Sequence, residues 1–192
     1  MLKRRLNKKT DYGQRLALLK SGLPRLVVRK TNNKILIQLV EFITSGDKTI
    51  AEASSLDLAP LGWKGHGGSV PAAYLAGMLA AGKAMKQGVK EAIADIGIQY
   101  SRKGVAIYAA IKGAKDAGLN ISAGEAFPDD ARIRGEHIVQ YAKFLKSKNK
   151  AAYEKQFSSY LKGGADPEDT AKNFEEVKQA IKSGRGIDDG KR

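Results

Sequence analysis

The sequence predicts an α/β protein. Its mixed sheet consists of an antiparallel meander plus a further strand, and helices flank the sheet. A basic N-terminal arm precedes this unit, and a helical C-terminal extension follows it. Two strand-forming runs meet at an Asn-Asn pair within residues 25–40. Strand and helix patterns then alternate to residue 118, and helical spacing dominates after Phe127–Pro128. We therefore divide the chain into an arm at 1–22, an α/β core at 23–127 and an extension at 128–192.

The arm carries a concentrated positive charge. Residues 1–30 hold ten of the 34 lysines and arginines but a single acid, Asp11, in a chain of net charge +14. A basic arm on a milder body indicates a polyanionic partner, with a solvated tail as the alternative. The arm lacks the bulky apolar anchors of a membrane-surface helix, so nucleic acid is favoured. We expect residues 1–22 to be extended, with a helical turn or two around 14–20, and disordered before RNA binds.

Residues 25–40 form a predicted β-hairpin. A two-residue loop at Asn32–Asn33 suits a turn that needs positive φ. The resulting register pairs Thr31 with Lys34, Arg29 with Leu36, and Val27 with Gln38. Alternation then places five apolar residues on one face, namely Leu26, Val28, Ile35, Ile37 and Leu39. The other face should be basic and meet a negative partner, with Arg25, Arg29, Lys34 and Gln38 beside Val27, Leu36 and Val40.

The following elements complete the sheet and place two helices beside it. A turn at 44–47 and a third strand at 48–55 extend the meander. Residues 56–68 form a loop that ends in a glycine-rich stretch. A helix then begins after its N-cap Ser69, has Pro71 in its first turn and ends at Gly88. A short buried strand at 91–98 and a second helix at 103–118 follow.

The extension is predicted to be helical. From Asp129 to about Lys162, four residues recur at helical spacing: Ile133, His137, Tyr141 and Phe144. Residues 163–169 interrupt this pattern. Asp166 then caps a last helix that has Pro167 at its first position and ends at Gly184.

The sequence nominates no catalytic residue, metal site or cofactor, and we expect the protein not to be an enzyme. Residues 77–84, GMLAAGKA, fit the start of a phosphate-binding P-loop. Ala84 stands where a hydroxyl should hold magnesium, however, and the string lies inside a predicted helix, so its glycines better explain close helix packing. With no cysteine and two histidines, the usual zinc sites cannot form. Asp95, on the predicted fourth strand, has no acidic companion for catalysis.

The loop LGWKGHGG at 61–68 leaves two interpretations of Trp63. Beside Lys64 and His66, its indole could stack on a base while the glycine amides cradle phosphate. Equally, Trp63 could fill the core while the glycines form turns. His137 lies on the apolar stripe of its helix, which favours a core or interface position.

No apolar run approaches the roughly 20 uncharged residues that span a bilayer. The longest, at 70–82, stops at Lys83. The N-terminus lacks the apolar block of a signal peptide, so we expect a cytoplasmic protein without a membrane partner.

Several motifs, in order, resemble one family. They are TDY at 10–12, RLVVRKTNNKILIQ at 25–38, GD at 46–47, PAAYLAG at 71–77, EAIADIGI at 91–98, KG and YAAIKGAKDAG within 103–118, and FPDDARIRGEHI at 127–138. The sequence therefore resembles large-subunit ribosomal protein eighteen, the partner of 5S ribosomal RNA, in its archaeal and eukaryotic-type branch. The match runs to about residue 145 and is looser beyond.

The resemblance implies a ribonuclease-H-like sheet without catalytic acids. It also implies a structural role in the large subunit: binding 5S rRNA and docking it onto the large-subunit rRNA, beside protein five and other neighbouring ribosomal proteins. The implied RNA contacts of the arm are Lys3, Arg4, Arg5, Lys8, Lys9, Tyr12 and Arg15. Those of the hairpin are Arg25, Arg29, Lys30, Asn32, Asn33 and Lys34. RNA or protein contacts are also implied for the loop with Trp63 and Lys64, and for Arg132 and Arg134. A non-ribosomal RNA-binding module is the alternative, with a nucleotide-binding enzyme far behind it.

Overall fold

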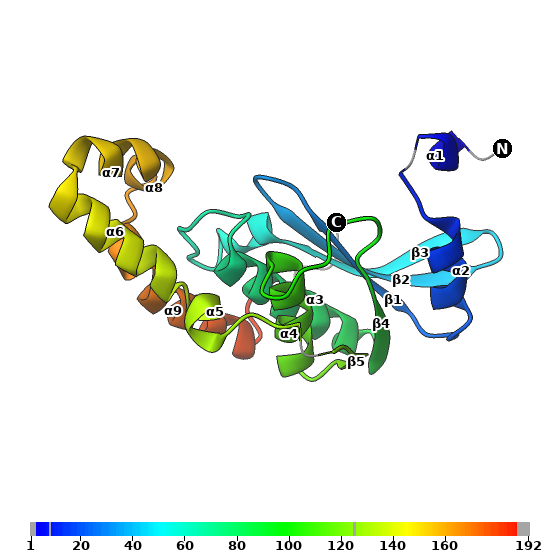
Figure 1. Ribbon diagram of the computed structural model, residues 1–192. Helices are drawn as coiled ribbons and strands as arrows, with labels where there is room; N and C mark the ends of the chain where they lie inside the picture. The colour runs from blue at the N-terminus through cyan, green and yellow to red at the C-terminus, as the bar shows by residue number, and fades with distance from the viewer. Residues whose placement is uncertain (1–2, 8, 125, 188–192) are drawn as a thin grey trace.

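A five-stranded mixed sheet forms the centre of the molecule in the computed structural model, which describes residues 3–187 except 8 and 125 (Figure 1). Its strand order is β3-β2-β1-β4-β5. β2 runs antiparallel to β1 and β3, whereas β4 is parallel to β1 and β5. The strands are β1 (Arg25–Lys30), β2 (Ile35–Ile43), β3 (Gly46–Ser54), β4 (Glu91–Asp95) and β5 (Asn120–Ser122). The predicted mixed sheet and ribonuclease-H-like arrangement are confirmed, with β5 added because three residues are too few for a recognisable alternation.

The hairpin of β1 and β2 has the predicted register. Arg29 lies opposite Leu36 and Val27 opposite Gln38, and the amide of Thr31 donates to the carbonyl of Lys34 at 2.9 Å. The five apolar residues of the predicted core face are fully buried, at 0 % exposure: Leu26, Val28, Ile35, Ile37 and Leu39.

Two helices, α3 (Val70–Lys86) and α4 (Ala106–Asp116), cover this apolar face and pack on each other. The Ser69 side chain caps α3 by accepting from the amide of Ala72, and Pro71 lies in its first turn, as predicted. The helices approach closely where each has a glycine. A Cβ on Gly77 would overlap the backbone carbonyl of Ala110, and one on Gly113 would overlap that of Tyr74. The string at 77–84 is therefore a packing motif within α3.

The topology brings several element ends to one edge of the sheet. β1 and β4 end there, and α3 and α4 begin there, because each helix returns the chain to the start of the next parallel strand. We call this the carboxyl edge. Ligands of open α/β sheets commonly bind at such an edge, outside the carboxyl ends of the strands.

The prediction of one continuous helix over residues 129–162 is wrong. The segment contains α5 (Asp130–Arg134), α6 (Glu136–Lys148), α7 (Lys150–Gln156) and α8 (Ser158–Lys162). Gly135 ends α5 with a φ of 84°, and Asn149 is extended and caps α7 through the amide of Ala152. These breaks fold α7 back on α6, where Ala142, Tyr153 and Phe157 form a second apolar cluster.

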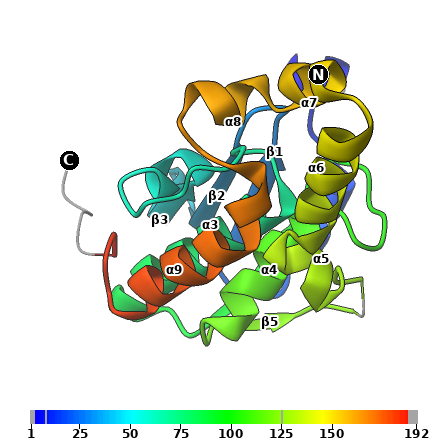
Figure 2. The same ribbon diagram turned by 90° about the vertical axis from the view of Figure 1, so that its left-hand side faces the viewer.

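The last helix, α9 (Thr170–Lys182), follows a 3₁₀ turn, η2 (Pro167–Asp169), so Asp166 caps that turn rather than the helix. Figure 2 shows α9 beside α3, and the two are in contact. Its apolar residues Phe174, Val177 and Ile181 belong to the main core. Helix α9 thus packs on the main core, to which the chain returns after α6–α8.

The arm forms two helices, α1 (Lys3–Leu6) and α2 (Tyr12–Leu19). The helical turns predicted around residues 14–20 are present in α2, whereas the prediction that the rest of the arm is extended is wrong at α1. α2 begins at Tyr12 because the Asp11 carboxylate accepts hydrogen bonds from the amides of Gly13 and Gln14. No residue of α2 is buried.

We expect the amides of α2 to exchange with solvent far faster than those of β1 and β2 in the free protein, and to become protected when RNA binds. An eight-residue helix without buried side chains is marginal by itself. Hydrogen–deuterium exchange measured by mass spectrometry tests this, with the buried hairpin as internal reference. Slow exchange across residues 12–19 in the free protein would show that the arm is folded beforehand.

Candidate nucleic-acid interface

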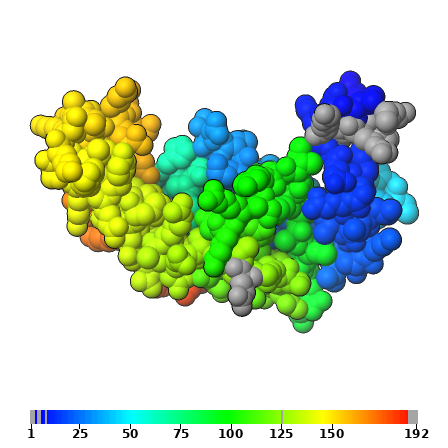
Figure 3. Space-filling view, viewed as in Figure 1, coloured from blue at the N-terminus to red at the C-terminus, as the bar shows by residue number. Residues whose placement is uncertain are grey.

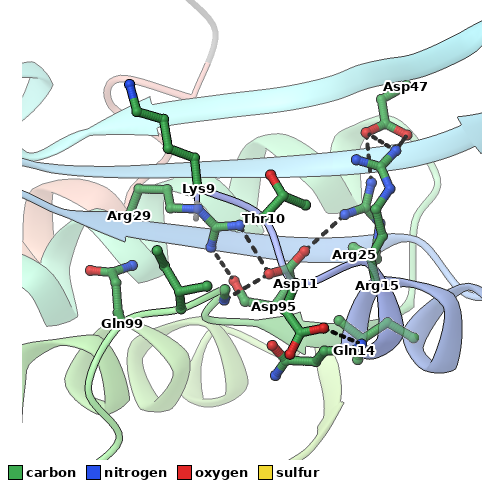
Figure 4. Close-up of a pocket in the computed structure, with 13 residues that line it drawn as sticks. Lys9, Thr10, Asp11, Gln14, Arg15, Arg25, Arg29, Asp47, Asp95 and Gln99 are labelled. Atoms are coloured by element: carbon green, nitrogen blue, oxygen red, sulfur yellow. Dashed lines mark hydrogen bonds and ion pairs between the residues drawn. The ribbon is translucent and has the colours of Figure 1, made fainter. Parts of the chain in front are cut away.

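Arg25 is held inside a network of charges between the sheet and the arm (Figure 4). Its side chain is only 4 % exposed. Its Nη1 donates to Asp95 Oδ2 and its Nη2 to Asp47 Oδ2, each at 2.8 Å. The expectation that Arg25 lies on an open basic face is therefore wrong, because acids from β4 and β3 neutralise it.

Arg29 shares Asp95 with Arg25. Its Nη1 donates to the carbonyls of Val28 and Asp95, and its Nη2 donates to Asp95 Oδ1 at 3.0 Å. The side chain nevertheless remains 42 % exposed. At the other end, Arg15 of α2 pairs with Asp47 at 2.8 Å. The three arginines thus alternate with two carboxylates, which explains how Arg25 and Arg29 can lie on one sheet face despite their like charge.

Asp95 acts as the counterion in this network. Burial alone would raise the pKa of its carboxyl, but the hydrogen bond and charge of Arg29, followed by those of Arg25, outweigh it and lower the pKa below the usual 3.8. The carboxylate is therefore charged at neutral pH and fully engaged. Its partners were not recognised in the sequence, although they lie on the strand that pairs with β4, where Val27 is opposite Asp95.

The hairpin tip is open to solvent. Lys30, Asn32, Asn33 and Lys34 are all exposed. The tip rests on the glycine-rich loop: a Cβ on Gly67 would lie 2.7 Å from the carbonyl oxygen of Asn33. The side chains of the tip therefore point outward from a supported backbone.

Trp63 belongs to the core. It is 6 % exposed and packs within the main apolar cluster. Gly65 lies against its ring, where a Cβ would come within 2.5 Å of Cζ2. The interpretation in which Trp63 stacks on a base is therefore wrong. Lys64 beside it is exposed, and its backbone amide donates to Asn173 Oδ1.

Comparison with known proteins identifies the family. Residues 1–91 match the model of a family described as "Ribosomal large subunit proteins 60S L5, and 50S L18". The large ribosomal subunit protein uL18 of Ignicoccus hospitalis is 48 % identical over 180 residues, which cover 93 % of this chain and 88 % of that protein. This chain belongs to the uL18 family. It is thus an archaeal-type ribosomal protein with a structural role in the large subunit.

The uL18 arm contributes cations beside the arginine network. Lys3 and Lys9 are exposed and Tyr12 is half-buried. Lys8 and the side chains of Arg4 and Arg5 lie outside the described residues. Lys9 and Arg15 line a cavity of about 600 Å³ together with Arg29 (Figure 4). The structure therefore brings part of the predicted arm set together with two hairpin residues, Arg29 and the buried Arg25.

The second group of predicted residues lies on α5, away from the arm. Arg132 and Arg134 are both exposed, and Arg134 Nε lies 3.7 Å from Glu175. Arg132 lines a groove at the carboxyl edge together with Lys30. Burial and the nearby charge of Arg132 lower the pKa of His137, which keeps this groove-lining imidazole neutral at pH 7.

Three exposed residues at the carboxyl edge did not enter the set predicted from the sequence: Tyr100, Arg102 and Lys103. They follow the end of β4, a position where loops of α/β sheets often carry binding residues. The sequence signal that could have identified them is their position after a predicted strand, with the adjacent cations Arg102 and Lys103 following the aromatic Tyr100.

Within the part of the chain that the structure describes, no helix is long and apolar enough to cross a membrane. The same residues contain no cluster of three or more histidine and acidic side chains that could hold a metal ion.

Proposed function

We propose that this protein binds 5S rRNA and helps to dock it onto the large-subunit rRNA in cytoplasmic ribosomes, next to protein five and other neighbouring ribosomal proteins. Membership of the uL18 family supports a ribosomal partner. The arm and the hairpin tip are the proposed 5S-binding surface.

The observation that carries this proposal is the separation of the basic residues into two sets. Arg25 is buried and neutralised inside the fold. In contrast, Lys3, Lys9, Lys30 and Lys34 are exposed, and none has a carboxylate partner among the residues described. Each such cation can replace a condensed counterion on an RNA phosphate. Asn32 and Asn33 add donors and acceptors for sugars and base edges.

A gel shift with 5S rRNA and an unrelated RNA of equal length tests the function. We expect 5S rRNA to bind more tightly at the same salt concentration, because the contacts at the tip read shape and base edges in addition to phosphate charge. Equal affinity for both RNAs would overturn the proposed selectivity for 5S rRNA. Docking is tested by asking whether the protein, with and without protein five, increases the association of 5S rRNA with large-subunit rRNA.

Lys34→Ala should weaken 5S rRNA binding and reduce its salt dependence. Loss of one phosphate contact lowers the slope of log affinity against log salt by somewhat under one unit, about 0.9 for a duplex. Filter binding over a range of salt concentrations measures both quantities. Arg29→Ala is a less clean test, because it also removes a partner of Asp95.

Lys90→Ala is the matched control, since Lys90 is also exposed but directly precedes β4, at the amino ends of the parallel strands and thus opposite the carboxyl edge. It makes the same change in net charge and should leave the slope almost unchanged. If both variants behave alike, the hairpin tip does not contact phosphate.

A further inference from the structure

A groove of about 1150 Å³ lies at the carboxyl edge of the sheet. The hairpin tip, the segment 99–107 that leads into α4, and α5 surround it, and parts of all three lie on the face shown in Figure 3. Four cationic side chains line the groove against one carboxylate, that of Asp129; they are Lys30, Arg102, Lys103 and Arg132.

These cations lack the neutralising partners of the arginine network. Arg102, Lys103 and Arg132 are exposed, and no ion pair within the described part of the chain joins them to an acid. α4 begins at Ala106, and its N-cap residue, Val105, provides no side-chain hydrogen bond to the first amides. Its first amides therefore add to the positive potential of the groove. An anionic ligand would relieve this concentration of like charge.

An exposed aromatic ring accompanies the cations. Tyr100 is 79 % exposed, the largest value among the large apolar and aromatic residues described. It lies on the groove beside Gln99 and Arg102. A free aromatic face next to cations is the arrangement by which proteins stack an unpaired base while holding its backbone. A duplex offers phosphates but no free base face to such a ring.

We infer that this groove binds a single-stranded RNA segment, with its phosphates at Arg102 and Lys103 and one unpaired base stacked on Tyr100. The inference rests on the proposed function in taking RNA as the partner. It adds a second contact surface, at the carboxyl edge, and assigns it to unpaired nucleotides. An acidic protein segment would use the cations without needing the ring, so the ring decides between the two ligands.

Short fluorescent oligouridine, which forms no duplex, is the probe, and fluorescence anisotropy of the full chain is the readout. Tyr100→Ala should weaken binding about fivefold or more, because stacking on an aromatic ring contributes on the order of 1 kcal/mol or more per base. Tyr100→Phe keeps the ring and should bind like the unmodified protein. Arg102→Ala should lower the salt slope by about 0.7, the value for one phosphate of a single strand.

Tyr141→Ala is the matched control, because Tyr141 is also an exposed tyrosine, at 48 %, but lies on α6 outside the groove. Unchanged affinity of Tyr100→Ala, or an equal loss in Tyr141→Ala, would overturn the inference. An effect of Arg102→Ala without one of Tyr100→Ala would indicate a general anionic ligand and would overturn it as well.

The result is separable from the test of the proposed function. Oligouridine binding does not measure selectivity for 5S rRNA. A protein that prefers 5S rRNA but shows no effect of Tyr100→Ala retains the proposed function and loses the groove. A protein with the Tyr100 effect but no preference for 5S rRNA retains the groove and loses the proposed function.

Discussion

Replacing Asp95 by Asn is expected to destabilise the folded protein by about 3 kcal/mol at neutral pH. Removing one partner of a buried ion pair commonly costs about 3–5 kcal/mol, because the other charge stays buried without compensation. The lower end applies here, since Arg25 keeps Asp47 and the side chain of Arg29 is 42 % exposed. Urea unfolding followed by circular dichroism measures the change in unfolding free energy.

The pH dependence of this loss has a defined sign. The folded-state pKa of Asp95 is lowered from 3.8. Its ionised form therefore contributes stability above the unfolded-state pKa, and the contribution is lost as pH falls through the lower folded value. The stability difference between the unmodified protein and Asp95→Asn should accordingly shrink in acid.

Asp130→Asn provides the control for charge removal at the surface. Asp130 pairs with Lys112, but its side chain is 76 % exposed, and such surface pairs contribute less than about 1 kcal/mol. If Asp95→Asn were no more destabilising than Asp130→Asn at neutral pH, the contacts of Asp95 with Arg25 and Arg29 would not stabilise the fold.

Gly77→Ala is expected to destabilise the protein by about 2–3 kcal/mol, although alanine favours a helix over glycine by about 1 kcal/mol. The added Cβ would overlap the carbonyl group of Ala110 and lie 3.1 Å from its Cα. These are backbone atoms of α4, so the overlap can be relieved only by separating two helices that are almost fully buried at their contact. Thermal and urea unfolding measure the loss.

Gly82→Ala tests whether the close approach, rather than the glycine itself, causes the effect. Its Cβ would meet Ile187 Cδ1 at 2.8 Å, the end of a side chain that can rotate away. We expect a change within about 1 kcal/mol, in either direction. Equal destabilisation by the two substitutions would contradict the packing interpretation of Gly77.

Much of the fold could be predicted because its signals are local. The alternation around Asn32–Asn33 determines both the register of the hairpin and its buried face, since a slip of one residue would turn every side chain to the other side. Ser69 and Pro71 likewise mark the start of α3 from within one turn. The break at Gly135 was missed because the helical spacing of Ile133, His137, Tyr141 and Phe144 continues across it. Gly135 packs against Thr170 and Pro71, which are distant from it in the sequence. Helical periodicity carries no information about such contacts.

The sequence by itself determined the family resemblance, the hairpin and the positive charge. Only the tertiary structure decided which cations are available to a ligand. Arg25, Arg29 and Lys34 share one face by alternation, yet Arg25 is buried and Lys34 is open. The difference comes from Asp47 and Asp95, which lie 22 and 70 residues from Arg25 in the chain. A charge is neutralised by whatever the fold places within a few ångströms, and the spacing of residues along one strand carries no information about those neighbours.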